Sequence, residues 1–279
     1  MKGKVLINLF LVALVLGLGL WMTTKPGNEG GPLTRLSTLK ADDVKVIRVM
    51  RDGIPEIVLE RAGKRWKQTA PFAARTDGSQ AGRLLELLAA QSQQSFPAEN
   101  LARFGLDKPF ARVIVGTQEF AFGTQNTLTQ EQYVLTGDRV HLVPPVFAYG
   151  LPTRADSLAT HMLLAEEDIP VRLELPGVTL AQKDGKWTRS TDTTEKSSQD
   201  DLTRWAEEWR FASSLATQPI DAEPKGEPVR ITLRDGRTID LVIVSRAPEL
   251  VIARKDEKLR FVFAADKAAS LFAPPKTEP

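Results

Sequence analysis

The sequence contains no cysteine. This absence excludes disulfide bonds, thiolate catalysis, cysteine-ligated zinc and a lipid anchor attached to cysteine. Histidine is nearly absent as well, because His141 and His161 are the only two. A histidine-based metal site or a Ser/His catalytic pair would have to use one of these two residues.

An excess of charge of either sign is also missing. The chain of 279 residues has 37 basic and 35 acidic side chains and a net charge of +2. Proteins that bind nucleic acids usually concentrate positive charge on one face. The near balance therefore indicates no nucleic-acid partner, and the length allows one large or two ordinary domains.

The common catalytic signatures are missing too. The sequence has no glycine-rich phosphate-binding motif of the G-x-x-x-x-G-K-[ST] or G-x-G-x-x-G type and no G-x-S-x-G turn. We therefore expect a protein that is not an enzyme, and we assign no catalytic, cofactor-binding or metal-binding residues.

One long apolar run is present at the N-terminus. Residues 5–24 read VLINLFLVALVLGLGLWMTT, with no charge between Lys4 and Lys25. Twenty helical residues span about 30 Å, the thickness of a bilayer core. Because Lys2 and Lys4 precede the run, the N-terminus should be cytoplasmic. Residues 1–24 thus predict a single-pass anchor in a bacterial inner membrane, with the remaining chain periplasmic.

A cleaved signal peptide is the alternative, with a weak site at Gly17-Leu18-Gly19. The apolar run continues through residues 20–22, which favours the uncleaved anchor. Either reading places the remaining chain outside the cytoplasm. The sequence KPGNEGG at residues 25–31 indicates a flexible linker, which we extend to residue 40.

Two tryptophan phrases indicate an internal duplication. GKRWKQT at Gly63–Thr69 is followed by GKWTRST at Gly185–Thr191, and Trp66 and Trp187 lie 121 residues apart. The same spacing separates Leu59 from Leu180, Leu84 from Trp205 and Leu88 from Trp209. We predict two copies of one module, at residues 41–165 and 166–275, with a tail at 276–279.

Each module should contain three strands, one helix and further strands. The expected strand segments are 45–51, 55–61, 63–69, 111–115, 119–123, 132–143 and 146–151, then 171–175, 179–182, 184–190, 229–233, 238–244, 250–254, 258–263 and 266–272. Helices are expected at 81–91 and 201–212, with caps at Asp77 and Ser198. The predicted class is α+β, a mainly antiparallel sheet with one covering helix per module.

A few polar residues deserve a chemical interpretation. His141, three residues from Asp138, fits a half-exposed strand position, and His161 fits a short connecting helix between the modules. The acidic run Glu166-Glu167-Asp168 could bind a cation, but it lacks the spacing of a calcium loop. We interpret it instead as a solvated connector between the modules.

The second helix carries the remaining candidates. Glu207 and Glu208 point about 100° apart on a helix, so they form no ready acid/base pair. Trp205 and Trp209 could form a platform for a sugar, but core packing is favoured because Leu84 and Leu88 occupy the matching positions. The repeated Trp66 and Trp187 are likewise expected in the core.

The first module resembles a known bacterial family. RFGLDKPFARVIV at residues 103–115, after GKRWKQTAPFAARTD at residues 63–77, is similar to the domain of unknown function 4340. Residues 132–134 and 140–143 would form its hairpin, and the likeness covers about 41–165. In the second module AEPKGEP replaces the Gly-Leu-Asp phrase. The resemblance implies an envelope component that accompanies ABC-type export systems, and it carries no catalytic residues.

Together these features predict a non-enzymatic, membrane-anchored periplasmic protein. It would be an accessory or scaffold of an ABC-type transport or envelope assembly system, with partners in the membrane, through residues 5–24, and among envelope or transport proteins. An extracytoplasmic binder of a glycan or lipid-linked ligand is the alternative, and it would need exposed aromatic residues in a cleft. A hydrolase using Asp or Glu is a third hypothesis.

The mature N-terminus tests the anchor. We expect mass spectrometry of the protein from its own membranes to find residues 5–24 retained, because the apolar run continues past the weak cleavage site. A mature chain starting at Leu20 would show a signal peptide instead.

Overall fold

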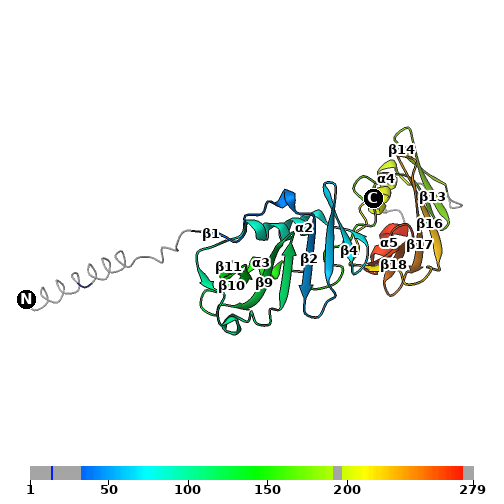
Figure 1. Cartoon of the computed structure of the whole chain (residues 1–279). Coiled ribbons are helices and arrows are strands. Elements are labelled where there is room, and N and C mark those ends of the chain that lie inside the picture. Colours follow the sequence, from blue (N-terminus) through cyan, green and yellow to red (C-terminus); the bar gives the residue numbers. More distant parts are fainter. Residues whose placement is uncertain (1–13, 15–32, 191–196, 273–279) are drawn as a thin grey trace, which may run out of the picture.

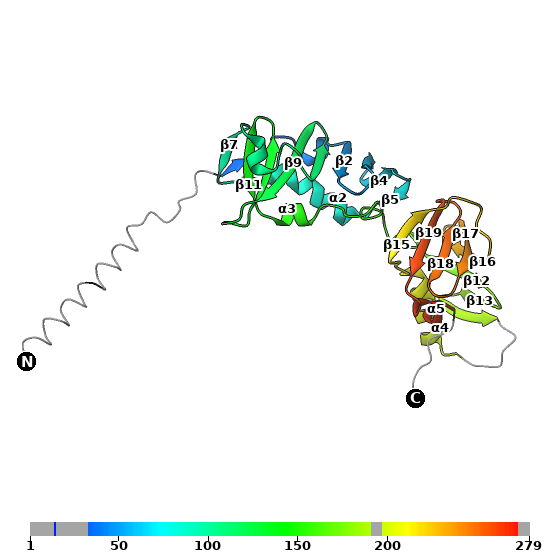
Figure 2. The same cartoon turned by 90° about the horizontal axis from the view of Figure 1, so that it is seen from below.

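The computed structural model describes residue 14 and residues 33–190 and 197–272. These residues form two large sheets with short helices against them (Figure 1). Figure 2 shows the sheets end to end, with β5 and β15 on the sides that face each other. Every strand pairing in the described residues is antiparallel.

The first sheet has nine strands in the described part of the chain, in the spatial order β5-β4-β3-β2-β8-β9-β10-β11-β7. Their bounds are β2 Val46–Arg51, β3 Ile57–Ala62, β4 Arg65–Ala70, β5 Ala74–Arg75, β7 Ser95–Pro97, β8 Ala111–Val115, β9 Gln118–Gln125, β10 Gln132–Thr136 and β11 Arg139–Val143. A separate small pair joins β1 (Thr34–Arg35) to β6 (Gln91–Ser92).

The second sheet has eight strands among the described residues, in the order β14-β13-β12-β16-β17-β18-β19-β15. Their bounds are β12 Pro170–Leu175, β13 Val178–Lys183, β14 Lys186–Ser190, β15 Ala216–Pro219, β16 Glu227–Leu233, β17 Thr238–Ser245, β18 Leu250–Arg254 and β19 Leu259–Phe263.

Both sheets follow the same path. In each sheet, three strands run from the middle to one edge, a helix follows, and a short strand then forms the far edge. A four-strand meander next starts in the middle, beside the first strand, and runs outward until it pairs with that far-edge strand. Trp66 of β4 pairs with Arg61, and Trp187 of β14 pairs with Gln182, so the two phrases occupy matching register positions. The first sheet differs by one additional edge strand, β5.

The helices are short and unequal in the two halves. Their bounds are α2 Gly78–Leu85, α3 Val146–Tyr149, α4 Gln199–Arg210 and α5 Lys267–Phe272, with 3-10 turns η1 Ala41–Asp43, η2 Glu86–Ala89 and η3 Leu101–Phe104. The expected caps are present: Asp77 accepts from the Ser79 backbone, and Ser198 forms a reciprocal capping box with Asp201.

The predicted class, α+β with one covering helix per module, is therefore wrong. The described residues form mostly antiparallel sheet, and each half has more than one short helix. The expected helix at 81–91 ends early because the chain tightens into η2 and then extends into β6. The expected strands at 146–151 and 266–272 are also wrong, since the short helices α3, which begins after Pro145, and α5 form there.

The expected transmembrane helix at residues 5–24 lies outside the described residues, apart from Leu14. Among the helices that are described, none is long and apolar enough to cross a membrane. The last residues of the expected linker are structured: β1 pairs with β6, and Leu36 is buried in the first core.

Two large cores lie between the helices and the sheets. Leu84 and Leu88 pack with Trp66 in the first. Trp205, Trp209 and Trp187 pack in the second. The indole N–H groups of Trp205 and Trp209 both donate to the carbonyl oxygen of Leu271 at 2.8 Å, which uses both lone pairs of that oxygen. The core interpretation of these aromatic residues is confirmed, and the sugar platform is excluded.

Candidate functional site

His141 lies on β11 and is 4% exposed, more buried than the half-exposed position we expected. Its Nδ1 atom is buried and has no hydrogen-bond partner among the described residues. Burial lowers the pKa of this imidazole, the charge of Arg139 lowers it further, and Asp138 opposes them. His141 is therefore a neutral core residue near pH 7.

His161 does not lie on a helix, because the segment between the modules consists of turns and isolated bridges. Its Nε2 atom is 3.8 Å from Oδ2 of Asp156. Burial raises the pKa of the Asp156 carboxyl, but hydrogen bonds from Arg154 and the Thr217 backbone N–H outweigh it and leave that pKa below its usual range. Asp156 thus serves as a structural anion.

The three side chains of the acidic run at residues 166–168 differ in exposure. Glu166 and Glu167 are exposed, as a solvated connector requires, but Asp168 is 1% exposed. Its carboxylate accepts from the Ala165 backbone N–H and from Arg237, at 3.0 Å each. The described residues contain no cluster of three metal-ligating side chains. The expectation of a solvated side chain is wrong for Asp168, whose carboxylate also lies 3.6 Å from the guanidinium of Arg254.

The two adjacent carboxylates of α4, Glu207 and Glu208, have different surroundings. Glu207 is exposed, whereas Glu208 is half-buried and accepts a hydrogen bond from Lys267 of α5. This contact ties α4 to α5 and involves no second carboxylate.

The segment at residues 152–168, here called the connector, is bound to both modules. On one side Thr160 N–H donates to the Arg75 carbonyl at 2.7 Å. On the other, Leu163 N–H donates to Ala212 at 2.9 Å. Leu158 belongs to the first core, while Ala159, Leu163 and Leu164 belong to the second. The connector therefore changes from one core to the other within a few residues.

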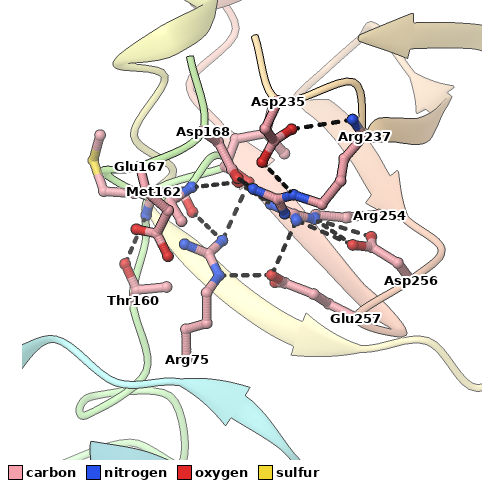
Figure 3. A network of polar contacts seen from close by, with 12 residues as sticks. Arg75, Thr160, Met162, Glu167, Asp168, Asp235, Arg237, Arg254, Asp256 and Glu257 are labelled. Carbon is pink, nitrogen blue, oxygen red and sulfur yellow. Dashed lines mark hydrogen bonds and ion pairs between the residues drawn. The ribbon is translucent and has the colours of Figure 1, made fainter. Parts of the chain in front are cut away.

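Five charged side chains join the modules at this point: Arg75, Asp168, Arg237, Arg254 and Glu257, here called the junction network (Figure 3). Arg75 reaches from β5 to Oε1 of Glu257 at 2.6 Å. It also donates to the carbonyls of Met162 at 2.7 Å and Leu163 at 3.2 Å. One arginine of the first module thus contacts the connector and the second module together.

Arg254 is the buried centre of the network, at 4% exposure. It donates to the Leu163 carbonyl at 2.7 Å and pairs with Asp256 through two nitrogens. Burial lowers the pKa of this guanidinium. The Asp256 hydrogen bond and the charges of nearby carboxylates outweigh burial and raise that pKa above its usual value. A buried cation is stable here because acceptors surround it.

Arg75 and Arg254 were not among the functional candidates predicted from the sequence. Arg254 had a usable signal, because Leu250, Ile252 and Arg254 share one face of a strand and the first two are apolar. A charge on an apolar face predicts a buried ion pair. Arg75 had no such signal, since its partners are distant in the sequence.

Two clefts flank the junction. One of about 800 Å³ lies between Pro71, Phe72 and β15, and its polar residues Asp156, Thr217 and Arg260 are bonded within the chain. The other, of about 670 Å³, lies between the β3–β4 turn, α2, the connector and the end of α4. We call this second space the α2 cleft.

The fold and the junction define a class: a two-module, mostly antiparallel β protein joined by a partly buried charge network. The chain belongs to the family described as Domain of unknown function (DUF4340), whose model matches residues 66–242, more than half the chain. The match runs from β4 to β17, so it extends into the second module instead of stopping at residue 165, and it does not include β2, β3, β18 or β19. No curated protein and no solved structure gives a significant match.

The junction network can be tested with Arg75→Ala. We expect the free energy of unfolding to fall by roughly 1–3 kcal/mol, because the change removes charge-assisted hydrogen bonds and leaves acceptors unpaired. Chemical denaturation measures this loss, and spin labels on each module should report a broader distance distribution. The matched control is Arg112→Ala, which removes an exposed ion pair with Glu119 within the first module. It should lower the free energy of unfolding by only about 0–1 kcal/mol. Equal effects in the two variants would contradict a special role for Arg75.

His141 should make the fold sensitive to acid. Its pKa is lowered from 6.5 in the folded chain, so the unfolded chain binds the proton more readily. The stability contributed by neutral His141 is fully present above the unfolded-state pKa of 6.5. It is lost as the pH falls from there through the lower pKa of the folded chain. Denaturation between about pH 7.5 and about pH 5 should show a smaller loss in His141→Gln than in wild type. The same loss in both proteins would refute this assignment.

Proposed function

We propose that the chain is a non-enzymatic extracytoplasmic scaffold, held at the bacterial cytoplasmic membrane by the apolar segment at residues 5–24. It acts as an accessory of an ABC-type transport or envelope assembly system. The observation that carries the proposal is the junction network, which fixes two sheets of the same topology end to end.

This arrangement suits a scaffold for a physical reason. Two similar modules held at a fixed separation present two binding faces, and the second binding event then costs little additional entropy. Arg75, Arg254 and Asp168 bind other groups of the chain itself, so their charges maintain the geometry. An exposed partner surface would lie elsewhere on the modules.

A glycan-binding role receives less support. Trp66, Trp187, Trp205 and Trp209 are between 0% and 8% exposed, so none offers an open stacking face. Trp21 lies outside the described residues. The lipid-linked form of the alternative is supported by the lining of the α2 cleft.

Co-purification tests the scaffold. We expect crosslinking of the full-length protein in its own membranes, followed by mass spectrometry, to recover ABC permease or ATPase subunits or other envelope proteins. Arg75→Ala should reduce that recovery severalfold, because loosened modules lose the benefit of fixed spacing. Arg112→Ala should not.

Two results would overturn the proposal. Recovery of the protein alone would exclude a stable envelope partner. Full recovery of partners with Arg75→Ala, in a variant whose modules are shown by spin labels to move apart, would exclude a role for the fixed junction.

A further inference from the structure

The α2 cleft has an unbalanced set of charges. Its lining includes the cations Arg61, Lys64, Arg65, Arg75 and Arg210 and the acids Asp77, Glu166 and Glu167. Arg65 pairs with Glu167, and Arg75 pairs with Glu257. Asp77 is occupied in capping α2. The charges left over are three cations, Arg61, Lys64 and Arg210, against the single carboxylate of Glu166.

The three cations lack anionic partners in the described part of the chain. Arg61 donates to the Ala41 carbonyl and lies 4.8 Å over the Trp66 ring. Arg210 lies 5.0 Å over the Phe211 ring and makes no hydrogen bond or ion pair with the described residues. The buried Nε atoms of both arginines and Oγ1 of Thr76 have no partner there. Unpaired polar atoms at one cleft are costly unless something else pairs with them.

Part of the same cleft is apolar. The apolar part of its lining includes Leu85 from α2, Met162 and Leu164 from the connector, and Phe211 after α4. Phe211 is 57% exposed, although large aromatic side chains are usually covered. The cleft beside β15 differs, because Asp156, Thr217 and Arg260 in its lining are hydrogen-bonded within the chain.

We propose that the α2 cleft binds a phosphate-bearing amphiphile. The phosphate group pairs with Arg61, Lys64 and Arg210, and the apolar chain covers Phe211 and Met162. Guanidinium groups match phosphate oxygens in pairs, and a phosphate monoester carries enough negative charge for more than one cation. Binding at this site can be measured without any partner protein, so its test is separate from the test of the scaffold role.

Two helix positions allow the cleft to be filled without damage. Gly78 and Gly82 of α2 line it, and a Cβ atom built on either meets no atom within 4 Å. Gly82→Leu should therefore reduce the space while favouring the helix, since leucine is the better helix former. Loss of binding in this variant would not reflect unfolding.

The test uses the full-length protein in micelles of an uncharged maltoside detergent, which carries no phosphate, with empty micelles as the blank. Isothermal titration compares hexyl phosphate, inorganic phosphate and hexanol. We expect hexyl phosphate to bind tightest. Arg210→Gln and Gly82→Leu should each weaken it at least about tenfold, whereas Arg204→Gln, an exposed arginine on the same helix outside the cleft, should leave it unchanged.

Each other outcome counts against the proposal. If inorganic phosphate bound as tightly as hexyl phosphate, the cleft would be a site for free phosphate. The proposed contact between an apolar chain and Phe211 and Met162 would then be wrong. If hexanol bound as tightly as hexyl phosphate, the proposed pairing of a phosphate with Arg61, Lys64 and Arg210 would be wrong. An absence of binding by either phosphate, or binding unchanged by Arg210→Gln and Gly82→Leu, would overturn the site altogether.

Discussion

The backbone carbonyl of Leu163 accepts hydrogen bonds from two arginines that belong to different modules, Arg75 and Arg254. The rest of the architecture depends on this shared acceptor. A guanidinium as buried as that of Arg254 is tolerated only while its acceptors stay in place. Arg75 is the member of the network that comes from the first module, and a rotation of that module would separate it from Glu257 and from the Met162 and Leu163 carbonyls. These contacts therefore hold the connector and both sheets in one arrangement.

The junction lies where the repeat is broken. Both sheets share eight strand positions in the described residues, but only the first adds β5 beyond β4. That additional strand carries Arg75, and its Ala74 packs into the second core. The bridge between Thr76 and Ala159 extends the same edge into the connector. A small asymmetry in otherwise matching halves therefore accounts for how they join.

Local patterns in the sequence predicted the local structure well. The strands around Trp66 and Trp187 and the caps at Asp77 and Ser198 follow from periodicity and side-chain chemistry within a few residues. The junction could not be predicted in this way, because Arg75 and Glu257 are distant in the sequence. The connector was misread as a helix for a related reason: its apolar residues serve two cores rather than one helix face.

The junction network and the α2 cleft are physically linked through Arg75, which belongs to both. The cleft is lined by β4 and α2 of the first module, by the connector and by Arg210 of the second. A ligand that spans these elements binds the joined arrangement more tightly than a loosened one, so its binding free energy adds to that of the junction. Coupling of this kind is reciprocal. A firm junction keeps the cleft formed, and an occupied cleft strengthens the junction.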